Sequence, residues 1–195
     1  MFITINARKF IKRISILIFI ASSILLAYTA KTILYPMRYS NYINRFSEEH
    51  DLDRALVYAV INAESRFRYR AVSRVGASGL MQIMETTANW IAEEMNLVGF
   101  VYEDHIFDPE INIKMGTWYL RRLIRIFEDE KVALAAYNAG TGNVSGWLED
   151  PANSSDGRTL SYIPFGETRR YVERVARYRE VYSMLLRWRN LWQSE

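Results

Sequence analysis

Hydrophobic residues in this chain form one continuous run near the N-terminus and several later stretches with helical spacing. The run covers residues 14–30, ISILIFIASSILLAYTA, which are seventeen positions without a charge. As a helix with a rise of about 1.5 Å per residue it would be about 25 Å long, slightly shorter than the hydrocarbon core of a bilayer. Lys31 can extend its ammonium group toward the membrane surface, so that residues 32–35 complete the span. The pattern therefore predicts an N-terminal transmembrane helix.

The same run also has the composition of a signal peptide. Four cations precede it, namely Arg8, Lys9, Lys12 and Arg13. Cleavage after Ala30 would place the bulky Tyr28 where a small residue is required, which favours a retained anchor. A buried core helix would normally carry polar positions, and the run has few. Because the cations keep the N-terminus in the cytoplasm, we expect residues 1–38 to be a cytoplasmic tail and membrane anchor, or a signal sequence, and residues 39–195 to be exported.

The exported part is predicted to be mainly α-helical. Apolar residues recur at helical spacing between Leu52 and Ala63, and that helix should end near Glu64. Further helices are expected after a cap at Thr86 or Thr87, from the Asp108-Pro109-Glu110 start signal to Phe127, over residues 131–137, and over residues 168–188. No convincing pair of strands is found. Residues 150–157, DPANSSDG, are expected to form a mobile surface loop.

Composition narrows the possible chemistry. The chain has no cysteine and two histidines, which argues against disulfides, thiol catalysis and histidine- or cysteine-rich metal sites, so no metal or other cofactor is predicted. The net charge of +3 is unevenly distributed. Residues 1–38 contain six cations and no acid, whereas residues 39–195 contain 19 Lys and Arg against 22 Asp and Glu, a net −3. The basic total therefore orients a membrane segment and does not predict binding to nucleic acid.

Polar residues are concentrated where the apolar helices end. Glu64 ends the first of these helices, residues 76–82 form a glycine-bearing turn with an amide, residues 136–140 end a buried helix, and residues 162–169 carry an acid just before the last helix. One acid at a helix end is usually only a solvated residue. Several such groups beside glycine or proline predict a cleft lined by separate segments.

Taken together, these segments closely resemble the Slt-type lytic transglycosylases of glycoside hydrolase family 23. The motifs are Glu64-Ser65, GASGLMQIM at 76–84, AYNAG at 136–140 and IPFGETR at 163–169, in the family's order and spacing. The resemblance covers about residues 42–187. It implies a lysozyme-like helical fold and makes residues 39–195 a lytic transglycosylase catalytic domain. Glu85 departs from the family, which usually has proline there, but an acid is also favourable at a helix start.

The resemblance implies that Glu64 is the single catalytic acid and base. It would protonate the glycosidic oxygen of the β-1,4 bond between N-acetylmuramic acid and N-acetylglucosamine in peptidoglycan, then accept the proton of the C6 hydroxyl, which closes on C1 to give a 1,6-anhydro end. Such an acid must be protonated at working pH. Its position at the end of an apolar helix raises its pKa by desolvation.

The resemblance also implies a set of substrate-binding residues: Ser73, Gln82, Met84, Tyr137, Asn138 and Glu167. Ser73 would bond near the catalytic acid, and Gln82 and Met84 would contact a sugar. Tyr137 would lie near the reacting sugar, and Asn138 would bind substrate or lock the turn. Glu167 would contact the glycan or its peptide. Structural roles compete with these: turn formation for Ser73, a satisfied core amide for Gln82, core packing for Met84 and Tyr137, and helix capping for Glu167.

Two alternatives to the transglycosylase remain. One is a hydrolytic muramidase of the same fold, and the other is an inactive cell-wall-binding scaffold module. The expected partners are peptidoglycan glycan strands and the membrane, with no nucleic acid, and the protein is expected to be a monomer. The expected location is the cell membrane, crossed once, with an extracytoplasmic catalytic domain, or secretion if the N-terminal segment is cleaved.

Overall fold

The computed structural model describes residues 7–193 and divides the chain into two compact units, Met1–Pro36 and Met37–Glu195. Residues 1–6 of the expected cytoplasmic tail and residues 194–195 lie outside the described part. So do the side chains of residues 7, 9–11, 13, 27, 28, 30, 192 and 193, which include the predicted cations Lys9 and Arg13 and also Tyr28.

The first unit contains the predicted apolar helix, α1 (Ala7–Leu34). Its stretch Ile14–Leu34 has a mean hydropathy of 1.9 over 21 residues and is long and apolar enough to cross a membrane. The hydroxyls of Ser23, Thr29 and Thr32 donate to backbone carbonyls of the preceding turn, at 2.8 to 2.9 Å. These polar groups are therefore satisfied within the helix, as a hydrocarbon environment requires.

The second unit is helical, as predicted. Its helices in the described part of the chain are α2 (Ser40–Glu49), α3 (Arg54–Ser65), α4 (Glu85–Glu94), α5 (Tyr102–His105), α6 (Pro109–Phe127), α7 (Glu130–Ala139), α8 (Thr141–Glu149) and α9 (Gly166–Gln193). Residues 71–83 form no strand, but two isolated bridges, Val72 with Ser78 and Ser78 with Ile83, fold this segment back on itself. We refer to residues 76–83 below as the bridged turn.

Short-range polar contacts set where several helices begin. The Asp108 side chain accepts hydrogen bonds from the amides of Glu110 and Ile111, at 2.7 and 3.2 Å, which confirms the predicted start of α6. Asp53 and Asp129 cap α3 and α7 in the same way. The predicted threonine cap of α4 is wrong, because that helix already begins at Glu85 and its N-cap, Met84, makes no side-chain cap bond.

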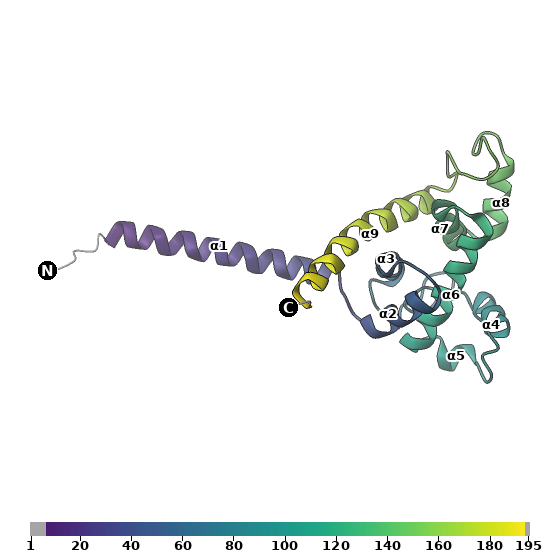
Figure 1. Ribbon diagram of the computed structural model, residues 1–195, viewed down its shortest axis with the longest axis horizontal. Coiled ribbons are helices and arrows are strands. Elements are labelled where there is room, and N and C mark those ends of the chain that lie inside the picture. The colour runs from purple at the N-terminus through teal and green to yellow at the C-terminus, as the bar shows by residue number, and fades with distance from the viewer. Residues whose placement is uncertain (1–6, 194–195) are drawn as a thin grey trace. The chain divides into compact units, whose positions relative to one another are not determined.

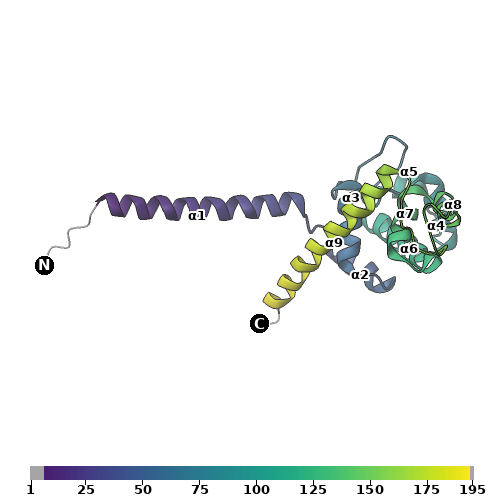
Figure 2. The ribbon, with the colours of Figure 1, turned by 90° about the horizontal axis from the view of Figure 1, so that it is seen from above.

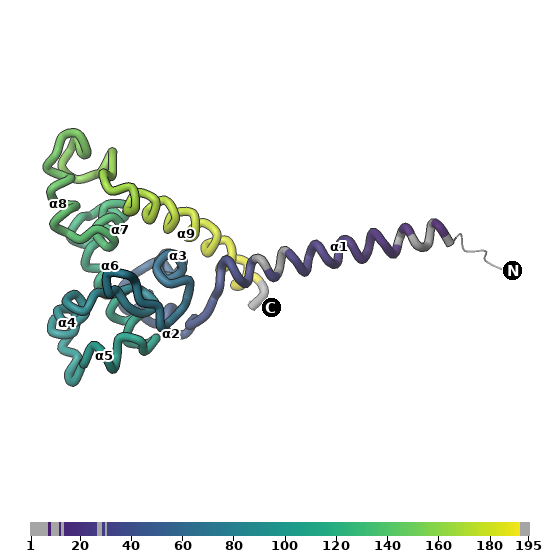
Figure 3. The backbone as a smooth tube through the Cα atoms, turned by 180° about the vertical axis from the view of Figure 1, so that it is seen from behind, coloured from purple at the N-terminus to yellow at the C-terminus, as the bar shows by residue number. Residues whose placement is uncertain are grey.

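Helix α3 lies in the core of the second unit. It contacts both α9 and α2, while α6 contacts α2, α4 and α7 (Figure 1). Views from above and from behind show α9 running across α3 (Figures 2 and 3). Tyr58 of α3 stacks on Tyr182 of α9 with ring centroids 5.2 Å apart, and Phe67 packs against both rings. This aromatic packing holds α3 and the residues just after it against α9.

Candidate active site

Glu64 occupies the last turn of α3 and is mostly buried. Desolvation raises the pKa of its carboxyl from 4.5 to about 7, and the negative charge of Glu167 acts in the same direction. The Tyr171 hydroxyl and the Arg174 guanidinium, both on α9, oppose this rise because they stabilise the ionised form. At neutral pH about half of the Glu64 side chains therefore carry a proton, so the group can both donate and accept one.

Tyr171 is the donor that acts on the pKa of this carboxyl. Its side chain is fully buried, and burial together with the charge of Glu64 raises its own pKa well above 10. Its hydroxyl makes no hydrogen bond of standard geometry to any described residue, so its action on Glu64 is that of a loosely aligned donor. The guanidinium of Arg174 lies 5.9 Å from the centre of the Tyr171 ring. One face of the Glu64 environment is thus built entirely by α9.

A pocket of about 270 Å³ lies between the bridged turn, α4, α6 and α7. Its lining includes four of the predicted substrate-binding residues, Gln82, Met84, Tyr137 and Asn138. It also includes Thr87 and Tyr119, which the sequence interpretation missed. Tyr119 could have been suspected as an aromatic on α6, but its helical spacing fits core packing equally well. We call this the sugar pocket.

Tyr137 connects the sugar pocket with the Glu64 environment. Its hydroxyl donates to the carbonyl of Met81 at 2.8 Å, and its ring lies 5.5 Å from that of Tyr119. Burial raises the pKa of Tyr137 well above 10, and the charge of Glu64 adds to this rise. The tyrosine is therefore a fixed, neutral wall between the acid and the pocket.

Gln82 is held rigidly at the rim of this pocket. Its amide nitrogen donates to the carbonyls of Ala71 and Gly79, at 3.1 and 2.9 Å, and its backbone has a φ of 49°. Both amide hydrogens are used in the fold, so any contact with a ligand would be made by the amide oxygen. Met84 is exposed and Asn138 is half-buried, so both side chains remain accessible beside it.

The side chain of Asn112, on α6, holds the bridged turn in place. The buried side chain of Asn112 accepts a hydrogen bond from the amide of Met81 at 2.8 Å and donates to the carbonyls of Ser78 and Ile106. A Cβ on Gly79, whose φ is +83°, would collide with Asn112, and a Cβ on Gly116 would collide with Met81. Asn112 is a further residue that sequence reasoning missed. Its only signal was one polar position on the apolar face of α6.

Glu64 does not line the sugar pocket, and two of the predicted substrate-binding residues also lie outside it. The Ser73 hydroxyl accepts a hydrogen bond from the amide of Ala77 at 2.9 Å, and the backbone of Ser73 bonds the same residue, so this side chain closes its own turn. Glu167 is exposed in the first turn of α9, yet its charge acts on the pKa of Glu64. Among the described residues no cluster of three His, Asp or Glu side chains could hold a metal ion.

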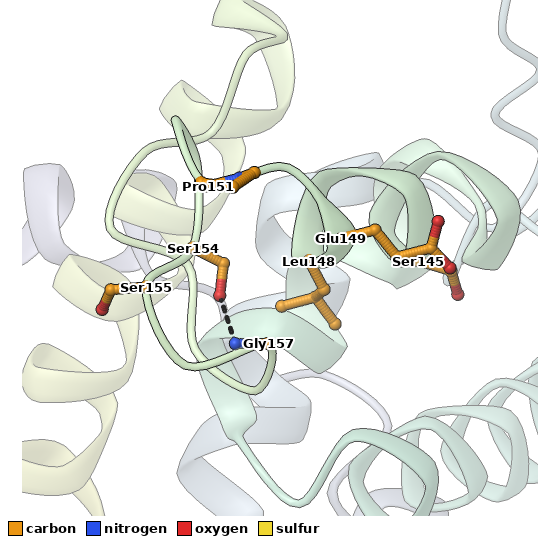
Figure 4. A pocket seen from close by; sticks show the side chains of 7 residues that line it. All are labelled: Ser145, Leu148, Glu149, Pro151, Ser154, Ser155 and Gly157. Atoms are coloured by element: carbon orange, nitrogen blue, oxygen red, sulfur yellow. Dashed lines mark hydrogen bonds between the residues drawn. The ribbon is translucent and has the colours of Figure 1, made fainter.

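A second pocket lies at the end of α8 and is lined by Ser145, Leu148, Glu149, Pro151, Ser154, Ser155 and Gly157 (Figure 4). The loop beside it, predicted to be a mobile surface loop, contains several hydrogen bonds of its own. Ser154 accepts from the amide of Gly157 at 3.0 Å, and Asp156 accepts from the amides of Arg158 and Thr159. These bonds hold the pKa of Asp156 below its ordinary value.

Comparisons with known proteins agree with this geometry. Residues 41–158 match the family described as Transglycosylase SLT domain. The chain is 35% identical over 150 residues to the soluble lytic murein transglycosylase of Escherichia coli strain K12, covering 76% of this chain and 23% of that protein. It is 34% identical over 116 residues to the membrane-bound lytic murein transglycosylase C of Edwardsiella ictaluri, covering 55% of this chain and 32% of that protein.

A solved structure is also similar. An inactive mutant of the lytic transglycosylase Slt from Pseudomonas aeruginosa superposes with a TM-score of 0.71 at 33% identity, covering 80% of this chain and 26% of that chain. The present chain thus spans about a quarter to a third of the length of the relatives named here. The match to the family ends at residue 158, before the predicted motif at 163–169. It nevertheless covers more than half of the chain, which therefore belongs to the transglycosylase SLT domain family.

Proposed function

We propose that this protein is a peptidoglycan lytic transglycosylase whose catalytic acid and base is Glu64. The observation that carries the proposal is a mostly buried carboxyl with a pKa of about 7, beside a tyrosine-lined pocket. Its relatives are named lytic murein transglycosylases, and murein is peptidoglycan. The fold, the family and the acid all support the same reaction class.

The reaction follows from a single proton carrier. Protonated Glu64 gives its proton to the glycosidic oxygen as the bond from that oxygen to C1 of muramic acid breaks. The resulting carboxylate then takes the proton of the C6 hydroxyl of the same sugar while that oxygen bonds to C1. Because the nucleophile is a hydroxyl of the substrate itself, the reaction needs no second carboxylate and no water. Glu64 ends each cycle protonated, and the product is a 1,6-anhydro sugar.

The sugar pocket is suited to orient this substrate. The rings of Tyr137 and Tyr119 and the side chain of Met84 offer apolar surface to a sugar face, and Gln82 and Asn138 offer amide groups to its hydroxyls. We assign Glu167 to the entrance, where it contacts the glycan or its peptide, and Ser73 to positioning the turn beside Glu64.

Product analysis tests the proposal. Purified peptidoglycan digested by the protein should give glycan ends about 18 Da lighter than reducing ends, the mass of one water. Reducing ends alone would identify a muramidase of the same fold. An absence of digestion by the folded protein would favour the wall-binding scaffold.

We further propose that α1 anchors the protein in the membrane as a single span, with residues 39–195 outside the cytoplasm. The apolar stretch Ile14–Leu34 and the membrane-bound relative support association with a membrane, and the cations before the stretch support this orientation. Fractionation of cells should find the intact chain in the membrane after an alkaline wash, and protease added from outside should digest residues 39–195. A soluble, N-terminally shortened protein would show that the segment is a cleaved signal.

A further inference from the structure

The segment that follows Glu64 carries an unusual concentration of cations. Residues 66–75, RFRYRAVSRV, contain four arginines and no acid. All four are exposed, at positions 66, 68, 70 and 74. Apolar side chains are exposed between them, since Tyr69 is 41%, Val72 61% and Val75 74% accessible. The mechanism proposed above uses none of these seven side chains.

Part of this segment forms a pocket of about 550 Å³ together with the residues that follow α1. The cations that line it are Arg38, Arg68 and Arg70, and its aromatic walls include Tyr39 and Tyr69. No acid lines it, and none of the three arginines forms an ion pair with any described residue. The guanidinium of Arg70 lies over the Tyr69 ring at 5.4 Å. We call this the arginine pocket.

The chemistry of the arginine pocket fits a phosphate group at an apolar boundary. Guanidinium groups bind phosphate through paired hydrogen bonds, and tyrosines favour the interface between hydrocarbon and water. The exposed Val72 and Val75 add apolar surface that an entirely water-soluble anion would leave uncovered. Arginines beside exposed apolar side chains are typical of surfaces that bind anionic lipids.

Covalent connection gives a second, independent argument. Arg38 follows Leu34, the last residue of α1, by four positions. An extended chain of that length reaches about 14 Å at most, so Arg38 cannot lie farther than this from the end of the apolar helix. If α1 spans a bilayer, as proposed above, Arg38 is held within or beside the headgroup layer.

We propose that the arginine pocket binds the phosphate of an anionic phospholipid headgroup, with Val72 and Val75 at the bilayer interface. This inference rests on the proposed membrane anchor. The contact would fix the segment between Glu64 and the bridged turn, and hence the orientation of the sugar pocket toward the wall.

The absence of cysteine allows a direct test on the full chain. A Val75→Cys variant is labelled with an environment-sensitive fluorophore and reconstituted into nanodiscs of phosphatidylcholine, with or without phosphatidylglycerol and with a lipid-borne quencher. Each arginine near an anionic surface favours the contact about fivefold, or about 100-fold for three. Emission should therefore shift to the blue and be quenched only in discs that contain phosphatidylglycerol. A Val98→Cys label, on an exposed residue between α4 and α5, should show neither effect.

Matched charge variants complete the experiment. Changing Arg38, Arg68 and Arg70 together to Gln should abolish the effect of phosphatidylglycerol, whereas the same change at the exposed Arg125, Arg158 and Arg177 should leave it intact. Equal signals in both lipids, or equal losses in both triple variants, would overturn the proposal. So would a signal produced by peptidoglycan in phosphatidylcholine discs, which would assign the pocket to wall anions. If α1 failed as an anchor, the chain would leave both kinds of disc. The pocket would then still be tested by flotation, which compares binding of the chain to phosphatidylglycerol vesicles with its binding to phosphatidylcholine vesicles.

Discussion

Two apolar helices of this molecule have similar side chains and opposite surroundings. In α1 the apolar side chains that the structure describes face outward all along the helix, and Leu26 is 70% exposed. In α3 the side chains from Ala55 to Ile61 are buried, and Ile61 is fully inaccessible. A helix that is apolar on every side needs either lipid or the interior of a protein around it. Protein surrounds the side chains of α3, whereas those of α1 suit the membrane span proposed above.

This difference bears on the catalytic role proposed for Glu64, which lies on α3. Both α2 and α9 pack on α3, and the mostly buried Glu64 lies at the C-terminal end of α3. An apolar protein environment can also hold an acid at a fixed position near a pocket. Tyr137 lines the sugar pocket and interacts electrostatically with Glu64. A lipid environment offers no such fixed arrangement.

Replacing the acid should have the largest effect. Glu64→Gln keeps the shape of the side chain but cannot transfer a proton, so we expect peptidoglycan digestion to fall by at least about 10³-fold, within the range attributed to general acid catalysis. Mass spectrometry of released glycan measures this. Glu103→Gln, an exposed glutamate on α5, is the matched control and should retain full activity. Comparable digestion by Glu64→Gln would refute the assignment.

Truncating one apolar side chain in each helix tests the comparison itself. Ile61→Ala in α3 leaves a cavity and should lower the free energy of unfolding of the second unit by about 2–5 kcal/mol. Leu26→Ala in α1 changes an exposed side chain in the other compact unit and should leave this free energy unchanged. Denaturant unfolding of the full chain in detergent, followed by tryptophan fluorescence, provides both values. Equal destabilisation by the two changes would mean that α1 is part of the folded core.

The dependence of stability on pH should reveal the burial of Glu64. Its pKa in the folded protein, about 7, exceeds the ordinary value of 4.5, so the folded state holds the proton more tightly than the unfolded state. This contribution to stability is fully present below pH 4.5 and is lost as the pH rises to about 7. The free energy of unfolding of the wild type, relative to that of Glu64→Gln, should thus fall by about 3 kcal/mol between about pH 4 and about pH 8. A constant difference would show that Glu64 is not desolvated.

The groups on α9 should have a smaller effect. Tyr171→Phe and Arg174→Gln each remove a group that favours ionised Glu64, so each should raise its pKa and move the loss of activity at high pH to higher pH, by less than about one unit. Glu167→Gln should move it slightly the other way, because the charge of Glu167 raises this pKa. Profiles of activity against pH measure the shifts. A shift of the same sign in all three variants would contradict the assigned electrostatics.

Strong local signals explain the parts of the fold that the sequence predicted. The apolar run of α1, the periodic residues of α3 and the Asp108-Pro109 start of α6 each specify a helix without help from distant residues. The helices α2, α5 and α8 were missed for a physical reason. In α8, Gly142 and Gly146 lower the helix propensity, and the helix depends on the burial of Val144 and Trp147. Tertiary packing of this kind cannot be read from a short window.

In the candidate site too, some residues could be predicted from local motifs and others depend on distant contacts. The sequence motifs named Gln82, Met84, Tyr137 and Asn138, and the structure brings these four into one pocket. Asn112 could not be predicted, because its role depends on a contact with Met81, 31 positions away in the sequence. The influence of Tyr171 and Arg174 on Glu64 is equally non-local, since it arises from the packing of α9 on α3.

The central claim is that burial in the folded protein raises the pKa of Glu64 to about 7. Carbon-13 NMR of glutamate carboxyls, with Glu64→Gln to assign the signal, measures its titration directly in the full chain. We expect one carboxyl resonance to titrate with a pKa of about 7 and to be missing in Glu64→Gln. Titration of Glu64 near its ordinary value of 4.5 would contradict both the desolvation of this side chain and its role as the catalytic acid.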